Sequence, residues 1–184
     1  MFSVNNNIKF TFEDNKYCLV FDLYVMNQLQ DVYGTLYNWD KKISQGDFDA
    51  LLIALTFMLN EGTKKMRAEG NIDYNFPTHE SIVKIAITEN MYSTINSVIT
   101  ASVDNTKNSK ESNNKFKEKI DFAQIYMFCA SKLHIPISQS KALTWDDHSE
   151  LVNSYFKTFG SKDQKSLSKK NEKGKKVLPF CNLK

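Results

Sequence analysis

Long stretches with a helical spacing of apolar residues, interrupted by few turn-forming residues, most limit how this chain can fold. Only 6 Gly and 3 Pro occur in 184 residues. So few chain-breaking residues favour long helices over a sheet of many short strands. The length suits one domain, or one domain with an appended helical part. Residues 48–59 are apolar on nearly all sides, so we expect them at the centre of the core.

A β-hairpin is expected near the amino terminus. Residues 8–21 contain two short β-rich runs around the tetrapeptide EDNK, whose acidic and Asn residues favour a tight turn. The next residues have a helical apolar period, with Asp22 as the expected N-cap and Gly34 as the expected end.

Two further helices are expected in the first half of the chain. One runs over about residues 47–61 and ends at Gly62, and the other begins with Thr78 as N-cap and continues to about residue 103. The fold class predicted for the chain is therefore mainly α with a small amino-terminal β-hairpin, an α+β arrangement.

The composition changes abruptly after residue 103. Residues 104–119 contain one aromatic side chain among polar and charged ones, which is typical of a flexible linker. A helix over about residues 121–133 follows, Pro136 breaks it, and residues 138–143 add one short turn. The predicted domains are an amino-terminal domain over residues 1–104, a linker over 105–119, a carboxy-terminal helical hairpin over 120–160 and a basic disordered tail over 161–184.

The last predicted helix has clear start and stop signals. Thr144 is placed to cap it and Asp147 to close a capping box, while Gly160 stands where a helix usually ends. The helical period forms one apolar stripe between them, made of Leu151, Val152, Tyr155, Phe156 and Phe159.

This stripe is the candidate partner-binding site. A hairpin of roughly 40 residues is too small to bury both of its helices, so some of its large side chains are expected to serve binding. The alternative, that the stripe packs on the preceding helix or on the main domain, is equally favoured by the sequence. The candidate partner-binding residues are Trp145, Leu151, Tyr155 and Phe156.

No catalytic, cofactor-binding or metal-binding residue is predicted. His79, His134 and His148 are the only histidines, and no two stand at a metal-ligand spacing on one helix. Residues 146–148, Asp-Asp-His, point to different helix faces, so helix capping explains them better than a metal site. Phosphate-loop, dinucleotide-binding, CxxC and GxSxG motifs are absent from the sequence. We therefore expect a non-enzymatic protein without a cofactor.

Cysteine usage and the lack of membrane segments indicate a cytoplasmic protein. Cys18 and Cys129 lie in apolar runs, where a free thiol behaves as a small core residue; a disulfide or a reactive thiol is the alternative. The amino-terminal residues lack the pattern of a signal peptide, and residues 48–59 are about half as long as a bilayer span.

The carboxy-terminal tail raises the alternative of nucleic-acid binding. Residues 161–184 contain eight Lys against Asp163 and Glu172, a local charge of +6, whereas the whole chain carries +3. Clustered Lys gains free energy from counterion release on phosphates. The tail lacks interleaved aromatic residues, and Arg67 is the only arginine of the chain, so a solvated tail is the simpler interpretation.

The order of these parts resembles a known family. A short β pair, a helix entered through Phe21 and Asp22 and ended at Gly34, an apolar helix and a long amphipathic helix resemble the amino-terminal domain of tail assembly chaperones of long-tailed bacteriophages and gene transfer agents. The acidic residue that the family usually has before the Gly is displaced to Asp31. Residues 122–156 resemble the carboxy-terminal part of the longer chaperone product, with His134 where a Gly is commoner.

The resemblance implies a function in tail assembly in the bacterial host cytoplasm. In this family a short and an extended product coat the tape measure protein until polymerisation of the tail tube displaces them. The tape measure protein is thus the expected partner, with the tail tube protein and self-association as further candidates. The alternative functions are a nucleic-acid-binding accessory protein that uses the basic tail, and a generic helical virion or interaction protein.

Overall fold

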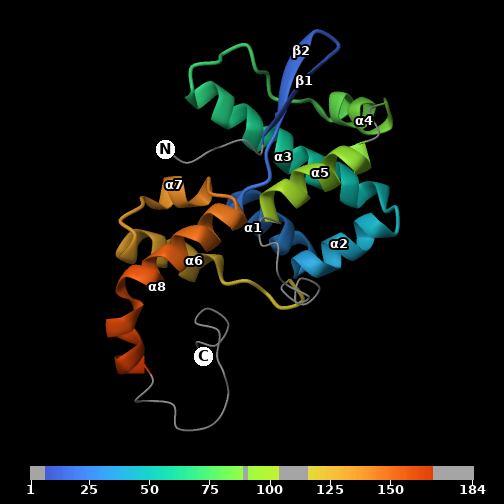
Figure 1. The fold of residues 1–184 in the computed structure, drawn as a ribbon. Coiled ribbons are helices and arrows are strands. Elements are labelled where there is room, and N and C mark those ends of the chain that lie inside the picture. Colours follow the sequence, from blue (N-terminus) through green and yellow to red (C-terminus); the bar gives the residue numbers. More distant parts are fainter. Residues whose placement is uncertain (1–6, 89–90, 104–115, 168–184) are drawn as a thin grey trace. The chain divides into compact units, whose positions relative to one another are not determined.

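The computed structural model describes residues 7–88, 91–103 and 116–167, and it confirms the mainly α fold with one small hairpin (Figure 1). Contacts divide the chain into two compact units, Met1–His148 and Ser149–Lys184. The elements described are β1 (Ile8–Phe12), β2 (Asn15–Leu19), α1 (Leu23–Tyr33), α2 (Leu36–Ser44), α3 (Phe48–Ala68), α4 (His79–Thr88), α5 (Met91–Val103), α6 (Phe122–Lys132), α7 (Ile137–Lys141) and α8 (Trp145–Leu167).

The hairpin is tighter than the sequence indicated. Strands β1 and β2 pair antiparallel from Ile8 opposite Leu19 to Phe12 opposite Asn15, which leaves Glu13 and Asp14 as a two-residue turn. Both turn residues have positive φ angles, 46° and 61°. This backbone matches the right-handed twist of the flanking strands, as two-residue hairpin turns require.

Helix α1 begins and ends where its caps were predicted. The backbone N–H of Val25 donates to the Asp22 carboxylate at 2.9 Å. Gly34 has a φ of 79°, and its N–H donates to the Gln30 carbonyl at 2.8 Å. A residue with this left-handed backbone closes a helix at little cost only when it lacks a Cβ atom.

Helix α2 was not anticipated from the sequence. Its N-cap is Thr35, whose hydroxyl accepts a hydrogen bond from the Asn38 N–H at 3.2 Å. Leu36, Trp39 and Ile43 form its buried face, and its remaining positions are largely polar. So narrow an apolar stripe over nine residues is a weak helical pattern, and tertiary packing stabilises the helix.

The predicted end of α3 at Gly62 is wrong, because the helix continues to Ala68. A Cβ atom on Gly62 would lie 1.9 Å from the Cys18 carbonyl oxygen and 2.6 Å from its carbon. The glycine therefore does not stop the helix. It lets the backbone of α3 approach that of β2, which runs beside it (Figure 1).

Two helices, α4 and α5, stand where one long helix was predicted, and residues 89–90 between them lie outside the described residues. The predicted N-cap is confirmed, because the Ser81 N–H donates to the Thr78 hydroxyl at 3.1 Å.

Residues 116–148 pack with the amino-terminal helices. Asp121 caps α6 by accepting from the Gln124 N–H at 3.0 Å. Phe122, Ile125 and Tyr126 of α6 are members of the same buried cluster as the side chains of α1, α3 and α5. The compact unit thus ends at His148, whereas the sequence placed boundaries at residues 104 and 120.

The predicted linker and tail are described only in part. Residues 105–115 and 168–184 lie outside the described residues, while Phe116 is half-buried and its carbonyl accepts from the Tyr37 N–H at 3.1 Å. Helix α8 does not end at Gly160 but continues to Leu167, so the first residues assigned to a disordered tail are helical. Glycine in a helix costs about 1 kcal/mol relative to alanine, which is too little by itself to end a long helix.

Candidate functional site

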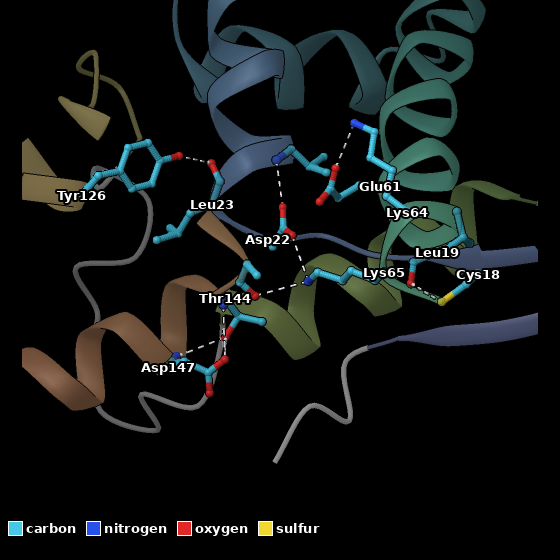
Figure 2. A network of polar contacts seen from close by, with 12 residues as sticks. Cys18, Leu19, Asp22, Leu23, Glu61, Lys64, Lys65, Tyr126, Thr144 and Asp147 are labelled. Carbon is cyan, nitrogen blue, oxygen red and sulfur yellow. Dashed lines mark hydrogen bonds and ion pairs between the residues drawn. The ribbon is translucent and has the colours of Figure 1, made fainter. Parts of the chain in front are cut away.

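Helix α8 carries the candidate partner-binding residues, and its start is fixed by the predicted capping box. The Thr144 N–H and hydroxyl both donate to the Asp147 carboxylate, at 3.2 and 2.8 Å. The Asp147 N–H in turn donates to the Thr144 hydroxyl at 3.1 Å (Figure 2). These reciprocal bonds satisfy donors of the first turn that would otherwise lack a partner.

Trp145 belongs to the packing of the first unit. Its half-buried ring lies against the main hydrophobic core. The ring centroid is 5.5 Å from that of Phe116, with the planes at 74° in an edge-to-face arrangement. Edge-to-face aromatic pairs are favourable beyond their buried area, so this side chain helps to hold the start of α8.

The other three candidates lie in the second unit, Ser149–Lys184, and are half-buried. The Tyr155 ring contacts that of Phe156 edge-to-face, with centroids 5.5 Å apart, and that of Phe159 at 5.2 Å. Phe159 is 56% exposed. We call Tyr155, Phe156 and Phe159 the aromatic cluster of α8.

Trp145 thus belongs to the first unit and Tyr155 and Phe156 to the second, and Tyr155 also contacts Phe159, which the sequence placed on the stripe but not in the site. Neither the members of the aromatic cluster nor Leu151 belong to the hydrophobic core clusters formed by the described residues. The assignment of Trp145, Leu151, Tyr155 and Phe156 to partner binding stays a prediction.

A buried polar network lies at the amino-terminal end of α1 (Figure 2). The Asp22 carboxylate is fully buried and forms an ion pair with Lys65 of α3 at 2.9 Å, while it also caps α1. Lys65 donates in addition to the Ala142 carbonyl at 3.2 Å. A buried carboxylate needs both a counter-charge and hydrogen bonds to offset its desolvation, and Asp22 has both.

Tyr126 extends this network from α6. Its hydroxyl donates to the Leu23 carbonyl at 3.3 Å. Burial, assisted by the nearby Asp22 carboxylate, raises the pKa of Tyr126 far above its usual value, so the hydroxyl stays protonated and acts as a donor. The network therefore ties α6 to α1 and α3, a structural role that the sequence pattern did not indicate.

The histidines do not converge on one site. His148 is buried in the first turn of α8, and burial lowers its pKa to about 4, so the imidazole is neutral at pH 7. His79 opens α4, and His134 follows α6 with a φ of 55°. Across residues 7–88, 91–103 and 116–167, no three His, Cys, Asp or Glu side chains are grouped so that they would hold a metal ion.

The two cysteines with described positions are free and buried, as predicted. Burial raises the pKa of Cys18 to about 11 and also raises that of Cys129, which keeps both thiols protonated and unreactive. Cys181 lies outside the described residues.

Among the described helices, none is both long and apolar enough to cross a membrane. No protein-family model, curated protein or solved structure matches this chain.

Proposed function

We propose that this chain is a non-enzymatic tail assembly chaperone of a long-tailed bacteriophage. It binds the tape measure protein in the host cytoplasm and keeps it soluble until the tail tube polymerises. The order of a hairpin, a capped helix, an apolar helix and a later amphipathic helix supports this proposal. The observation that carries it is the exposed Phe159, which lies one helical turn from Tyr155 on α8 with the two rings in contact.

The spacing of the aromatic cluster suits a helical partner. Tyr155 and Phe159 are four residues apart, so they lie one turn from each other on the same face of α8, and their rings are in contact. Helices that bind in apolar grooves use anchors at this spacing. Rigid aromatic side chains also supply much contact area for little loss of conformational entropy.

A tape measure protein has the complementary property. A very long helical chain exposes apolar stripes before assembly, and such stripes aggregate unless they are covered. Many small copies cover a long target efficiently, because contacts that are weak for each copy add up along the chain. Weak individual contacts also permit release when the tail tube displaces the chaperone.

Co-expression with the tape measure protein from the same gene cluster tests the proposal. The variant is Phe159→Ala, and the matched control is Phe76→Ala, which removes a 50% exposed phenylalanine from a loop of the first unit. We expect Phe159→Ala to lower the soluble fraction of tape measure protein several-fold, and Phe76→Ala to leave it unchanged. Both variants should melt within about 2 °C of the parent chain, because removing an exposed side chain costs little.

Tyr155→Ala separates the binding role from a core role. If Tyr155 serves binding, its removal lowers the solubility of the tape measure protein and hardly changes the stability of the chaperone. If it is a core residue, its removal lowers the free energy of unfolding by about 3–5 kcal/mol. The proposed site is contradicted if the tape measure protein stays soluble with both Phe159→Ala and Tyr155→Ala.

A further inference from the structure

Strand β1 carries main-chain groups on its outer edge that β2 does not use. In a hairpin with a two-residue turn, the residues that flank the turn exchange both main-chain hydrogen bonds, and bonded and non-bonded pairs alternate from there. Phe12 and Asn15 flank the turn. Lys9 and Thr11 of β1 therefore belong to non-bonded pairs, and their N–H and C=O groups point away from β2. We call these four groups the free edge of β1.

The corresponding edge of β2 is covered by other parts of the chain. The same alternation turns the main-chain groups of Lys16 and Cys18 away from β1. Lys16 forms a parallel bridge with Tyr74 there, and the Cys18 carbonyl lies against α3. The free edge of β1 has no such cover, because among the residues that the structure describes the sheet has two strands and no other main-chain group bonds to it. An edge of this kind is a template for a further strand.

The side chains of β1 are arranged symmetrically about Phe10, the middle residue of the strand. Apolar side chains at both ends and in the middle are half-buried and pack against the main hydrophobic core, namely Ile8, Phe10 and Phe12. Between them, Lys9 and Thr11 are exposed on the opposite face. A copy of this strand that runs antiparallel therefore offers apolar side chains to apolar ones and polar side chains to polar ones.

We infer that the free edge of β1 binds the free edge of a second copy, antiparallel and with a two-fold axis at Phe10. In this register Lys9 of each copy lies opposite Thr11 of the other copy. The two residues exchange both of their main-chain hydrogen bonds, as bonded antiparallel pairs do. Four hydrogen bonds form across the axis, and they use every group of the two free edges.

The self-complementarity of β1 in this register is the reason to assign a second copy as the occupant. The ammonium group of Lys9 faces a threonine and not another ammonium group, and like charges placed directly opposite would be destabilising. Phe10 faces Phe10, and such aromatic cross-strand pairs are favourable. A shift by two residues opposes the two ammonium groups in one direction and moves Lys9 beyond the end of the partner strand in the other.

The association closes at a dimer and is weak. Since the outer edge of β2 is covered, each hairpin offers one edge, so two copies form a four-stranded sheet without a site for a third. Two strands of five residues bury less than the roughly 1,200 Å² of stable complexes, and we expect a Kd of roughly 0.1–1 mM. The two Lys9 side chains are diagonal neighbours at roughly 7–8 Å, so salt, which screens their repulsion, should strengthen the dimer. This inference does not depend on the proposed function.

Disulfide trapping between two variants tests the register. Lys9→Cys and Thr11→Cys are made separately in a background with Cys18→Ala and Cys181→Ser, because Cys18 lies opposite Lys9 within the hairpin. In the proposed dimer, position 9 of one copy lies about 5.5 Å from position 11 of the other, which a disulfide spans, whereas equal positions are roughly 7–8 Å apart. Oxidised at about 0.5 mM, the mixture of both variants should give several-fold more covalent dimer than either variant alone.

Thr11→Pro tests the main-chain hydrogen bonds in solution. Proline removes an N–H that the hairpin does not use, and edge strands tolerate proline at such positions. The matched variant is Thr11→Val, which keeps this N–H. Sedimentation velocity from about 0.02 to 1 mM should show equal association for Thr11→Val and the parent chain, and a Kd raised at least about tenfold for Thr11→Pro. Circular dichroism establishes that each variant is folded.

Three results would each overturn the inference. The first is a parent chain that stays monomeric at about 1 mM, also at high salt. The second is cross-linking of either cysteine variant alone to the extent of the mixture. The third is a folded Thr11→Pro chain that associates as Thr11→Val does; if Thr11→Pro does not fold, the trapping experiment decides alone.

Discussion

Replacing Gln30 with Leu tests whether the carboxy-terminal elements belong to the same cooperative fold as the amino-terminal ones. Leu has nearly the size of Gln, so the substitution leaves the volume almost unchanged. It removes both 2.7 Å hydrogen bonds to Ile120 and leaves one main-chain donor and one acceptor without their partner. The perturbation therefore acts on residues that are 90 positions apart in the sequence.

The expected loss of stability follows from these two groups. An unsatisfied buried polar group costs about 1–3 kcal/mol. Ile120 is only half-buried, so water compensates in part, and the lower half of that range applies to each group. We expect Gln30→Leu to lower the free energy of unfolding by about 2–4 kcal/mol. Gln28→Leu, at a half-buried position of the same helix, should change it by at most about 0.5 kcal/mol.

Gln30→Glu adds a test that depends on the hydrogen bonds themselves. When the new carboxyl is ionised, it accepts from the Ile120 N–H but repels the Ile120 carbonyl, and burial raises the pKa of such a group. When it is protonated, its hydroxyl donates to that carbonyl and restores both bonds. The free energy of unfolding of Gln30→Glu should thus approach that of the parent chain as the pH falls from 8 to 5, because the carboxyl of the variant then takes up a proton.

Urea unfolding followed by circular dichroism measures these free energies, and both variants are compared with the parent chain at each pH. A single transition with an unchanged urea dependence is expected for Gln30→Leu, because one cooperative unit is destabilised. If Gln30→Leu lowers the free energy of unfolding by less than about 0.5 kcal/mol, the role assigned to this amide is refuted. A free-energy difference between Gln30→Glu and the parent chain that does not change with pH would refute it as well.

Two further predictions concern other parts of the first unit. Gly62→Ala should lower the free energy of unfolding by at least about 3 kcal/mol, because the added methyl meets the Cys18 carbonyl at 1.9 Å; Gly70→Ala, with a φ of 91° but no atom within 4 Å, should cost only about 1 kcal/mol. Equal effects of the two substitutions in urea unfolding would contradict the close approach. Burial lowers the pKa of His148 from 6.5 to about 4. Below pH 6.5 the unfolded chain therefore binds a proton that the folded chain does not bind, and this favours the unfolded state. The free energy of unfolding should therefore fall by about 3 kcal/mol between pH 7 and pH 4 because of this group. In His148→Gln this part of the pH dependence should be absent. If the pH dependence of the variant equals that of the parent chain, the imidazole titrates normally.

Local signals of the sequence were sufficient to predict where α1, α4, α6 and α8 begin, but not where α2 and α5 begin. Asp22, Thr78, Asp121 and Thr144 each accept a hydrogen bond from an N–H three residues later. Such a bond depends only on the cap and the first turn, so its residues are adjacent in the sequence. The hairpin and the end of α1 were predictable for the same reason, because their turn residues alone determine the backbone conformation.

Contacts between distant segments were not predictable in this way. Gly62 has the sequence signature of a helix end, yet its role follows from the approach of Cys18, a residue 44 positions earlier. Ile120 follows a polar stretch that is typical of a linker, but its backbone is bound by Gln30. A polar composition describes how a segment interacts with water and does not exclude recognition of its main chain. The boundary predicted at residue 104 lies within the compact unit Met1–His148.

The candidate site illustrates the same limit within one helix. Trp145 and Tyr155 continue one helical pattern, and periodicity gives them the same role. The structure packs Trp145 on Phe116 and the core, while the ring contacts described for Tyr155 include Phe156 and Phe159 of α8. Periodicity shows that a face is apolar but not what covers it. Because the first turn of α8 is fixed by its capping box and by Trp145, a loss of the proposed tape measure binding on changing Phe159 can be attributed to the aromatic cluster. The control is the tryptophan fluorescence of the variant, which reports Trp39 and Trp145 together and should stay unchanged.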